Sequence, residues 1–205
     1  MSVSGNVNRL TTLPVSESGP PERGDAARNR ALLLDAARRL IDERGAEAVT
    51  TDDIATAAGV GKGTLFRRFG SRAGLMIVLL DEDEKTQQQA FLFGPPPLGP
   101  GAPALDRLLA YGRERLKFVD VHRALLSDVG RDPQMRFNAP MMLHHSHIRF
   151  LLKSADTTGD LDAQATALHA LLDADYVHHE IADRGRTLDQ VGDAWETVAR
   201  KLCGT

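Results

Sequence analysis

Apolar residues recur along most of this chain at intervals of three and four, which is the spacing of one face of an α-helix. The pattern starts over residues 28–44, and Gly45 is expected to end this first helix in a left-handed conformation. The strict alternation of apolar and polar residues that marks half-buried strands is found nowhere. The pattern therefore predicts an all-α fold of about nine helices.

Two short helices and one longer helix follow the first. The short ones are expected over residues 51–58 and 62–69, joined by a tight turn at Gly59-Val60-Gly61. Thr50, with an aspartate three residues later, resembles a capping box for the first of them. Ser71 is a good N-cap for the longer helix, which should run to about residue 89. We place the boundary of this N-terminal unit, residues 25–73, inside that longer helix.

Residues 94–103, rich in proline and glycine, interrupt the helical pattern and predict a stiff connecting loop. Residues 74–205 are long enough to form a second unit with a core of its own. Pro140 either kinks one of its helices or starts a new one. The helices expected after the loop span residues 104–119, 122–130, 133–153, 160–183 and 187–202.

Composition narrows the class of protein. The chain has 205 residues, of which 42% are hydrophobic and 26% charged, the balance of an ordinary soluble globular protein. No apolar run approaches the ~18 residues that span a bilayer, and the start of the chain lacks a stretch typical of a signal peptide. Residues 1–24 have no periodicity and predict a disordered tail. One cysteine, Cys203, excludes an internal disulfide framework, so we expect a cytoplasmic protein.

The charge of the chain is unevenly distributed. The net charge is −3, but residues 1–22 carry −1, residues 23–73 carry +3 and residues 74–205 carry −5. A basic unit of about fifty residues therefore precedes an acidic one. This asymmetry bears on nucleic-acid binding only if the basic residues converge on one face.

The two short helices and their turn have the spacing of a helix-turn-helix. In the second helix, Leu65 and the aromatic residue four positions later form an inward face, so that Thr64, Arg67 and Arg68 can point outward. Its first turn holds Lys62 and lies beside glycines, where free backbone N–H groups favour anions and the backbone can approach another surface closely. This combination suits a recognition helix that enters a major groove with its N-terminus first.

Residues 28–80 resemble the N-terminal DNA-binding domain of TetR-family transcriptional regulators. The resemblance rests on many positions in one register, which is more specific than the helix-turn-helix spacing alone. The matched positions are Leu33-Leu34-Asp35-Ala36-Ala37, Leu40, Gly45, Thr50, Ile54-Ala55, Ala58-Gly59-Val60, Lys62-Gly63-Thr64-Leu65, Phe69, Ser71-Arg72 and Leu75.

The resemblance implies roles for individual residues. Thr50 or Thr51 would contact a phosphate, and Arg72 would bind a backbone phosphate where the family usually has Lys. Two positions depart from the family pattern, which commonly has Ser or Thr at Gly61 and Tyr at Phe66. The phenyl ring of Phe66 cannot make the hydrogen bond of a tyrosine hydroxyl. The implied DNA-contacting residues are Thr50, Thr51, Lys62, Gly63, Thr64, Arg67, Arg68 and Arg72.

In TetR-like proteins the part after the helix-turn-helix dimerises the chain and binds a small molecule. Apolar residues of the last helix are spaced three and four apart, an a/d stripe, and the helix before it has a similar stripe. Two such stripes would build a four-helix dimer interface; alternatively, both serve the core of the single chain. We favour the interface because dimers match two half-sites. The assigned residues are Leu168, Leu172, Leu188, Val191, Trp195 and Val198.

A ligand pocket would draw on bulky and polar residues of the middle helices. Pockets are mostly apolar with few polar groups, and adjacent methionines adapt to varied shapes. Most of these residues are still expected to be ordinary core. The candidates are Tyr111, Phe118, Met141, Met142, His145, Phe150 and Tyr176.

The seven histidines raise the question of a metal site. His144, His145 and His147 lie close together, but only His144 and His147 share a helix face. No cysteine or carboxylate stands at a ligand spacing beside them, so we expect surface imidazoles or buried, hydrogen-bonded ones. We predict no metal and no cofactor.

These observations favour a dimeric repressor that an unidentified small-molecule effector releases from double-stranded operator DNA in the cytoplasm, with the protein at the nucleoid when bound. A tilt of the helix after Ser71 would change the separation of the two recognition helices. One alternative is an all-α enzyme, for which no nucleophile–base pair, carboxylate dyad or cofactor motif is visible. Another is an interaction protein that has lost operator binding, as the departures at Gly61 and Phe66 would allow. We expect neither enzyme activity nor a membrane partner.

Overall fold

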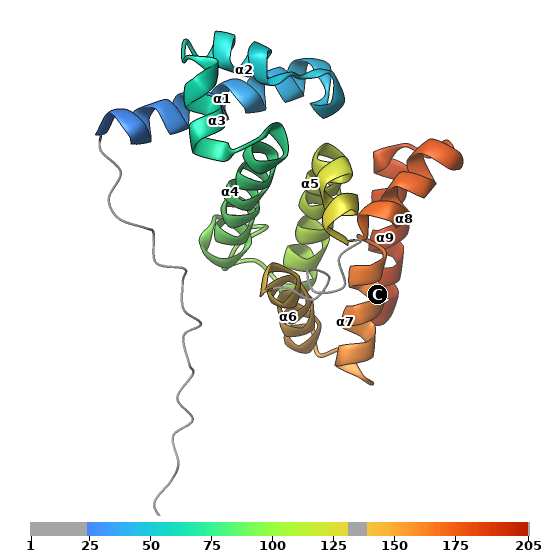
Figure 1. The fold of residues 1–205 in the computed structure, drawn as a ribbon. Helices are drawn as coiled ribbons and strands as arrows, with labels where there is room; N and C mark the ends of the chain where they lie inside the picture. The colour runs from blue at the N-terminus through green and yellow to red at the C-terminus, as the bar shows by residue number, and fades with distance from the viewer. Residues whose placement is uncertain (1–23, 131–138, 205) are drawn as a thin grey trace, which may run out of the picture.

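The computed structural model describes residues 24–130 and 139–204, and every regular element in these ranges is helical (Figure 1). The predicted all-α fold is therefore confirmed. The predicted tail, except for Gly24, and the predicted helix start near residue 133 lie outside the described residues. None of the described helices is long and apolar enough to cross a membrane.

The helices of the N-terminal unit lie close to their predicted positions. Both α1 and α4 are longer than expected because helix-forming residues flank them. In Figure 1, α1, α2 and α3 lie at the top, and α4 descends from them towards the rest of the molecule. The elements are α1 (Gly24–Arg44), a 3₁₀ turn (Ala46–Ala48), α2 (Thr51–Ala57), α3 (Lys62–Phe69) and α4 (Arg72–Phe93).

Local hydrogen bonds explain where these helices begin and end. The hydroxyl of Thr50 accepts from the Asp53 backbone N–H at 3.1 Å, and the Asp53 carboxylate accepts from the Thr50 backbone N–H at 3.0 Å. The predicted capping box is thus present. Ser71 caps α4 by accepting from the Gly74 N–H at 3.0 Å. Gly45 follows α1 with a φ of 79°, a conformation that favours glycine.

The core of the N-terminal unit consists entirely of apolar side chains among the described residues. It reaches past the predicted boundary at residue 73 into α4, so that α4 belongs to both cores. Its buried members are Leu33, Leu34, Ala36, Ala37, Leu40, Val49, Ile54, Ala55, Leu65, Leu75, Met76 and Leu79.

The helices after the loop, together with the C-terminal half of α4, form the second unit, which we call the body. Two predictions of helix bounds were wrong. Residues 104–130 form one helix rather than two, since no proline or glycine interrupts it near residue 120. The predicted helix over 160–183 is broken because Asp173 accepts from the Asp175 and Tyr176 N–H groups, at 3.0 and 3.3 Å, and so caps a new helix. The elements are α5 (Ala104–Gly130), α6 (Ala139–Ser154), α7 (Leu161–Ala170), α8 (Ala174–His178), a π-helical turn (His179–Asp183) and α9 (Leu188–Leu202).

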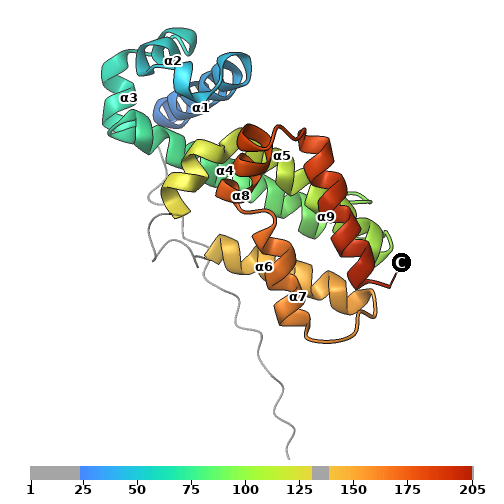
Figure 2. The same cartoon turned by 90° about the vertical axis from the view of Figure 1, so that its right-hand side faces the viewer.

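Helix α5 forms the centre of the body and contacts α4, α6, α8 and α9. Figure 2 shows α9 along the outside of the body, with α6 and α7 below it. Where α5 and α9 cross, a Cβ on Gly112 would lie 2.3 Å from the Trp195 ring, so this close approach requires glycine. The indole N–H of Trp195 donates to the Leu168 carbonyl at 2.9 Å. The crossing therefore ties α5, α7 and α9 together.

This packing corrects the predicted dimer interface. Leu168, Leu172, Val191 and Trp195 are buried in the core of the single chain, so a second copy cannot contact their side chains. The a/d spacing shows that one face of α9 is apolar, and here α5 of the same chain covers that face. Within the predicted set, Leu188 is partly buried against the core, whereas Val198 is 38% exposed.

Candidate DNA-binding surface and polar core

The turn between α2 and α3 holds the two helices in a fixed relation. Gly59 has a φ of 65°, and the Val60 N–H donates to the Ala55 carbonyl at 3.0 Å. Gly61 then caps α3 with its backbone alone, because no side chain is present to accept from the first turn. Leu65 is fully buried and anchors α3 against the N-terminal core. The opposite face of α3 is left for solvent.

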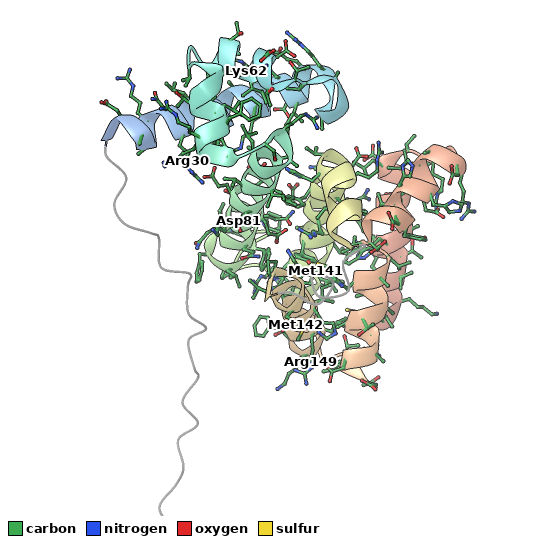
Figure 3. The ribbon with its side chains drawn as sticks, viewed as in Figure 1. Arg30, Lys62, Asp81, Met141, Met142 and Arg149 are labelled. Carbon is green, nitrogen blue, oxygen red and sulfur yellow. The ribbon has the colours of Figure 1, made fainter. Side chains whose placement is uncertain are left out.

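That outward face carries the predicted recognition residues. Lys62 and Arg67 are exposed, and Thr64, half-buried, accepts a hydrogen bond from the Arg67 guanidinium at 3.1 Å. Lys62 forms an exposed ion pair with Asp52 of α2 at 2.6 Å. A Cβ on Gly63 would meet nothing within 4 Å, so a second surface can approach the backbone there. Figure 3 places Lys62 on the N-terminal unit, far from Arg149 of α6.

Other predicted contact residues are already engaged within the chain. The Arg72 guanidinium donates to the Val49 carbonyl at 2.8 Å and to the Ala46 carbonyl, so it holds the 3₁₀ turn against the start of α4. The hydroxyl of Thr50 is used in the capping box, and its hydrogen bonds lower the pKa of the Asp53 carboxyl. Thr51 and Arg68 are half-buried. Phe66 is 41% exposed and packs less against the core than its apolar character suggests.

The body contains a cluster of buried polar side chains that joins α4, α5 and α6. The Arg115 guanidinium of α5 donates to the Glu84 carboxylate of α4 at 2.7 Å. His144 of α6 hydrogen-bonds the other oxygen of Glu84 through Nε2, and Nδ1 of the same ring lies 2.8 Å from the Tyr111 hydroxyl. All four residues are buried. They form a continuous hydrogen-bonded chain through the interior.

The protonation states in this cluster follow from burial and partners. The neighbouring His144 and Arg115 hold the pKa of Glu84 down to about 2, against the opposing effect of burial, so it is a carboxylate. Burial lowers the pKa of His144, which favours the neutral ring, and raises the pKa of Tyr111 above its ordinary value. A neutral His144 can donate from Nε2 to Glu84 and accept at Nδ1 from Tyr111. Both ring nitrogens of His144 and the Tyr111 hydroxyl are thereby matched.

Beside this cluster, two buried nitrogens have no hydrogen-bond partner among the described residues. Nε of Arg107 and Nε2 of His147 are both buried, and neither contacts an acceptor or donor. The His147 ring lies 4.3 Å from the Phe91 ring and 5.2 Å from the Tyr111 ring, measured between centroids. Burial, and then the nearby Arg107 and His144, lower the pKa of His147 to about 4.

Three consecutive acids on α4 connect this interior to the N-terminal unit. Glu82 and Asp83 pair with Arg38 of α1 at 3.1 and 2.7 Å, and Asp83 also lies 3.0 Å from His122 of α5. Glu84, the next residue, turns into the body. We call Glu82, Asp83 and Glu84 the acidic triplet. A cavity of about 40 Å³ lies at the same junction, lined in part by Arg38, Asp83 and His122.

The predicted pocket residues fall into three groups. Tyr111 and Phe118 are buried, and Phe118 stacks on His122. Met142 and Phe150, by contrast, are 54% and 53% exposed on the outer face of α6, so they do not line an interior pocket. Figure 3 shows Met142 on this helix beside Met141. Partly buried positions are held by Met141, Tyr176 and His145, the last 3.2 Å from the Thr166 hydroxyl.

Sequence reasoning missed the buried polar residues themselves, namely Glu84, Arg115, His144 and His147 as site residues. A usable signal was that Glu84 lies seven residues before the apolar Phe91 and so shares its helix face. The shared face of His144 and His147 was recognised, and both are buried. Within the described ranges, no group of three or more His, Cys, Asp or Glu residues could hold a metal ion.

Comparison with known proteins shows which family the sequence of the N-terminal unit matches. Residues 33–79 match the family described as bacterial regulatory proteins, tetR family. A protein named as an HTH-type transcriptional regulator of Staphylococcus aureus (strain bovine RF122 / ET3-1) is 36% identical over 64 residues, which cover 31% of this chain and 35% of that protein. The chain thus spans about a third of the length of the curated relatives it matches.

Solved structures share the whole fold. A transcriptional regulator from Saccharomonospora viridis, determined in complex with choline, superposes with a TM-score of 0.65 over 83% of this chain and 95% of that chain, at 22% identity. A TetR-like transcriptional regulator from Rhodococcus sp. RHA1 gives a TM-score of 0.55 over 86% and 97%, at 24% identity. At this identity the likeness concerns the fold, and it includes the body as well as the N-terminal unit.

Proposed function

We propose that this chain, whose residues 33–79 form a helix-turn-helix domain of the tetR family, regulates transcription by binding double-stranded operator DNA through α3. The observation that carries the proposal is the difference between the two faces of α3. Its inner face is anchored by buried Leu65, while Lys62 and Arg67 stand on the outer face beside an open glycine backbone. Lys62 lies at the N-terminus of α3, where another surface can approach the backbone closely, and Arg67 lies in the last turn. Both cations are suited to phosphate and base contacts.

A gel shift on the DNA that flanks the gene tests the proposal. Affinity should fall linearly with salt on a log–log scale, because cationic side chains release counterions from phosphates. Lys62→Ala and Arg67→Ala should each weaken binding by roughly tenfold. Lys117→Ala, which removes an equally exposed cation from α5, is the matched control and should not. Full affinity in both α3 variants would contradict the assignment of α3.

The proposal includes a homodimer, because one short recognition helix rarely binds a single site tightly and two half-sites are roughly 34–36 Å apart. The inner face of α9 is used within the chain, so the dimer would form through its outer face, where Val198 and Thr197 are exposed. Dimerisation through α9 would leave α3 free on the opposite part of the chain, as the separation in Figure 1 allows.

We further propose that the body binds a small effector and that this binding releases the operator. The Saccharomonospora viridis regulator was determined in complex with choline, which supports small-molecule binding by a protein of this fold. The acidic triplet supplies a route from the body to the DNA-binding unit. Glu84 contacts α5 and α6, and the two residues directly before it, Glu82 and Asp83, hold Arg38 of α1. A coupling of about 1–3 kcal/mol suffices for a 5–150-fold change in DNA affinity.

The cellular setting follows from the same role. A regulator that acts on operator DNA works in the cytoplasm, at the nucleoid when bound. We assign no catalytic reaction to the chain, since proteins of this family normally act by binding.

A further inference from the structure

Two nitrogens in the interior of the body have no hydrogen-bond partner in the part of the chain that the structure describes, and they lie close to the same residue. The Arg107 guanidinium of α5 donates from Nη2 to the Phe91 carbonyl at 3.3 Å, while its Nε is buried and unmatched. His147 of α6 stacks on the Phe91 ring with Nε2 unmatched. Burying such groups without a partner is unfavourable, and native interiors rarely leave them so.

The charges around this pair leave a surplus of donors. The Glu84 carboxylate, the buried acid nearby, already accepts from Arg115, His144 and Gln88. Among the described residues, no carboxylate lies within ion-pair distance of Arg107. Arg107 therefore has donor capacity and positive charge to offer, and the neighbouring Glu84 carboxylate is already engaged by three other side chains.

The surroundings of the pair are aromatic. Phe91 and Tyr111 stand edge to face with their centroids 5.4 Å apart, and the His147 ring lies against both. Three helices, α4, α5 and α6, contribute these residues. Aromatic side chains with a few polar groups are the usual lining of a small-molecule site. These rings pack against one another, so a bound ligand would have to part them.

We propose that Arg107 and His147 bind the carboxylate of a small organic acid whose apolar or aromatic part lies against Phe91 and Tyr111. The proposal rests on the proposed function in taking the body as the effector-binding part, and it names the chemical class of the effector. Arg107 Nε–H donates to one carboxylate oxygen, and His147, in the tautomer or protonated form that carries a proton on Nε2, donates to the other. The charge of the Arg107 guanidinium disfavours a cation at this position.

Isothermal titration of the full chain with benzoate, phenylacetate and hexanoate tests the site. Benzamide and phenyltrimethylammonium serve as neutral and cationic probes of similar shape. At least one acid should bind, and benzoate should bind at least about tenfold more tightly than benzamide, the effect expected from charge-assisted hydrogen bonds. The cationic probe should give no binding.

Variants locate the binding. Arg107→Met keeps the apolar stem and His147→Phe keeps the ring, and each should weaken acid binding by about tenfold or more. Lys117→Met removes one positive charge from an exposed position of α5 and should leave it unchanged. Without ligand, His147→Phe should melt at the same temperature or higher, because it removes an unmatched buried nitrogen. That result shows that loss of binding in this variant does not come from misfolding.

Two results would overturn the site: no heat from any of the three acids at millimolar concentration, or equal acid affinity in wild type, Arg107→Met and His147→Phe. In either case water alone would satisfy the two nitrogens. A gel shift in the same buffers distinguishes failure of the acid-binding site from failure of the proposed function. Acid binding without release of DNA supports the site and contradicts the effector role, whereas operator binding without acid binding contradicts only the site.

Discussion

The two cores of this chain differ in the kind of side chain that they bury. The N-terminal core, within the described residues, contains only apolar groups, whereas the body buries Glu84, Arg115, His144, His147 and Glu180. An apolar core requires only shape and volume, but a buried polar group requires a partner at a defined distance. The N-terminal unit is thus suited to hold one geometry, and the body to respond to changes in charge, protonation or ligand.

The strongest test of this contrast is to remove one charge from the body. Glu84→Ala leaves the Arg115 guanidinium buried without its carboxylate, and should lower the free energy of unfolding of the body by about 3–5 kcal/mol. Urea unfolding followed by circular dichroism measures the loss. In the N-terminal core, Leu65→Ala should cost a similar 2–5 kcal/mol, but through a cavity.

A triple variant distinguishes the two causes. Replacing Glu84, Arg115 and His144 by Leu, Met and Leu removes the charges together and should recover most of the stability lost in Glu84→Ala, because no unpaired buried charge remains. Equal destabilisation of the single and triple variants would show that packing, rather than charge pairing, dominates the body.

A smaller loss of stability should appear in mild acid. It should be confined to the body, because all seven histidines lie beyond residue 121. Burial lowers the pKa of His147 and of His169 to about 4, from an ordinary value of 6.5. Between these values the unfolded chain binds protons that the folded chain does not, so the free energy of unfolding falls as the pH drops from 6.5 towards 4. The expected loss is about 1–2 kcal/mol per histidine at pH 5.

Melting curves at pH 7.5, 6 and 5 measure this loss, and His147→Phe should reduce it. The stability contributed by the neutral histidines is fully present above pH 6.5. A melting temperature that fell equally in wild type and in His147→Phe would assign the acid sensitivity to other groups.

The smallest expected effects distinguish Arg72 from Lys62, two cationic residues of the N-terminal unit. Arg72→Ala should lower its stability by about 1 kcal/mol, since the guanidinium holds the Val49 carbonyl. It should leave the salt dependence of operator binding unchanged, whereas Lys62→Ala should reduce the log–log slope by about 1. Gel shifts at four salt concentrations give both slopes. A reduced log–log slope for Arg72→Ala would show that Arg72 contacts a phosphate.

The N-terminal unit could be predicted almost to the residue because its determinants are local. Thr50 and Ser71 cap their helices through residues three positions away, and Gly59 takes its positive φ inside a short turn. The inward face of α3 is also predictable from local information, because helical spacing alone assigns Leu65 to it. Local hydrogen bonds and periodicity are properties that a single sequence displays.

The body could be predicted only in outline because its determinants are distant. The apolar stripe of α9 indicates that another element covers this face. That element is α5 of the same chain, some eighty residues earlier, which the stripe itself does not reveal. Likewise, Glu84 reads as one more acid of a solvated run, and only its contacts with Arg115 and His144 place it inside. Met142 and Phe150 show the converse, as apolar residues that no distant element covers.

The close crossing of α5 and α9 has a consequence for spectroscopy. The single tryptophan, Trp195, sits on Gly112, and both tyrosines, Tyr111 and Tyr176, also belong to the body. Near-ultraviolet absorbance, fluorescence and circular dichroism from tryptophan and tyrosine therefore come from the body alone, while far-ultraviolet circular dichroism reports the helices of both units. Without any label, the two optical signals record the body separately from the whole chain, so that a difference between their unfolding curves would show the two cores melting independently.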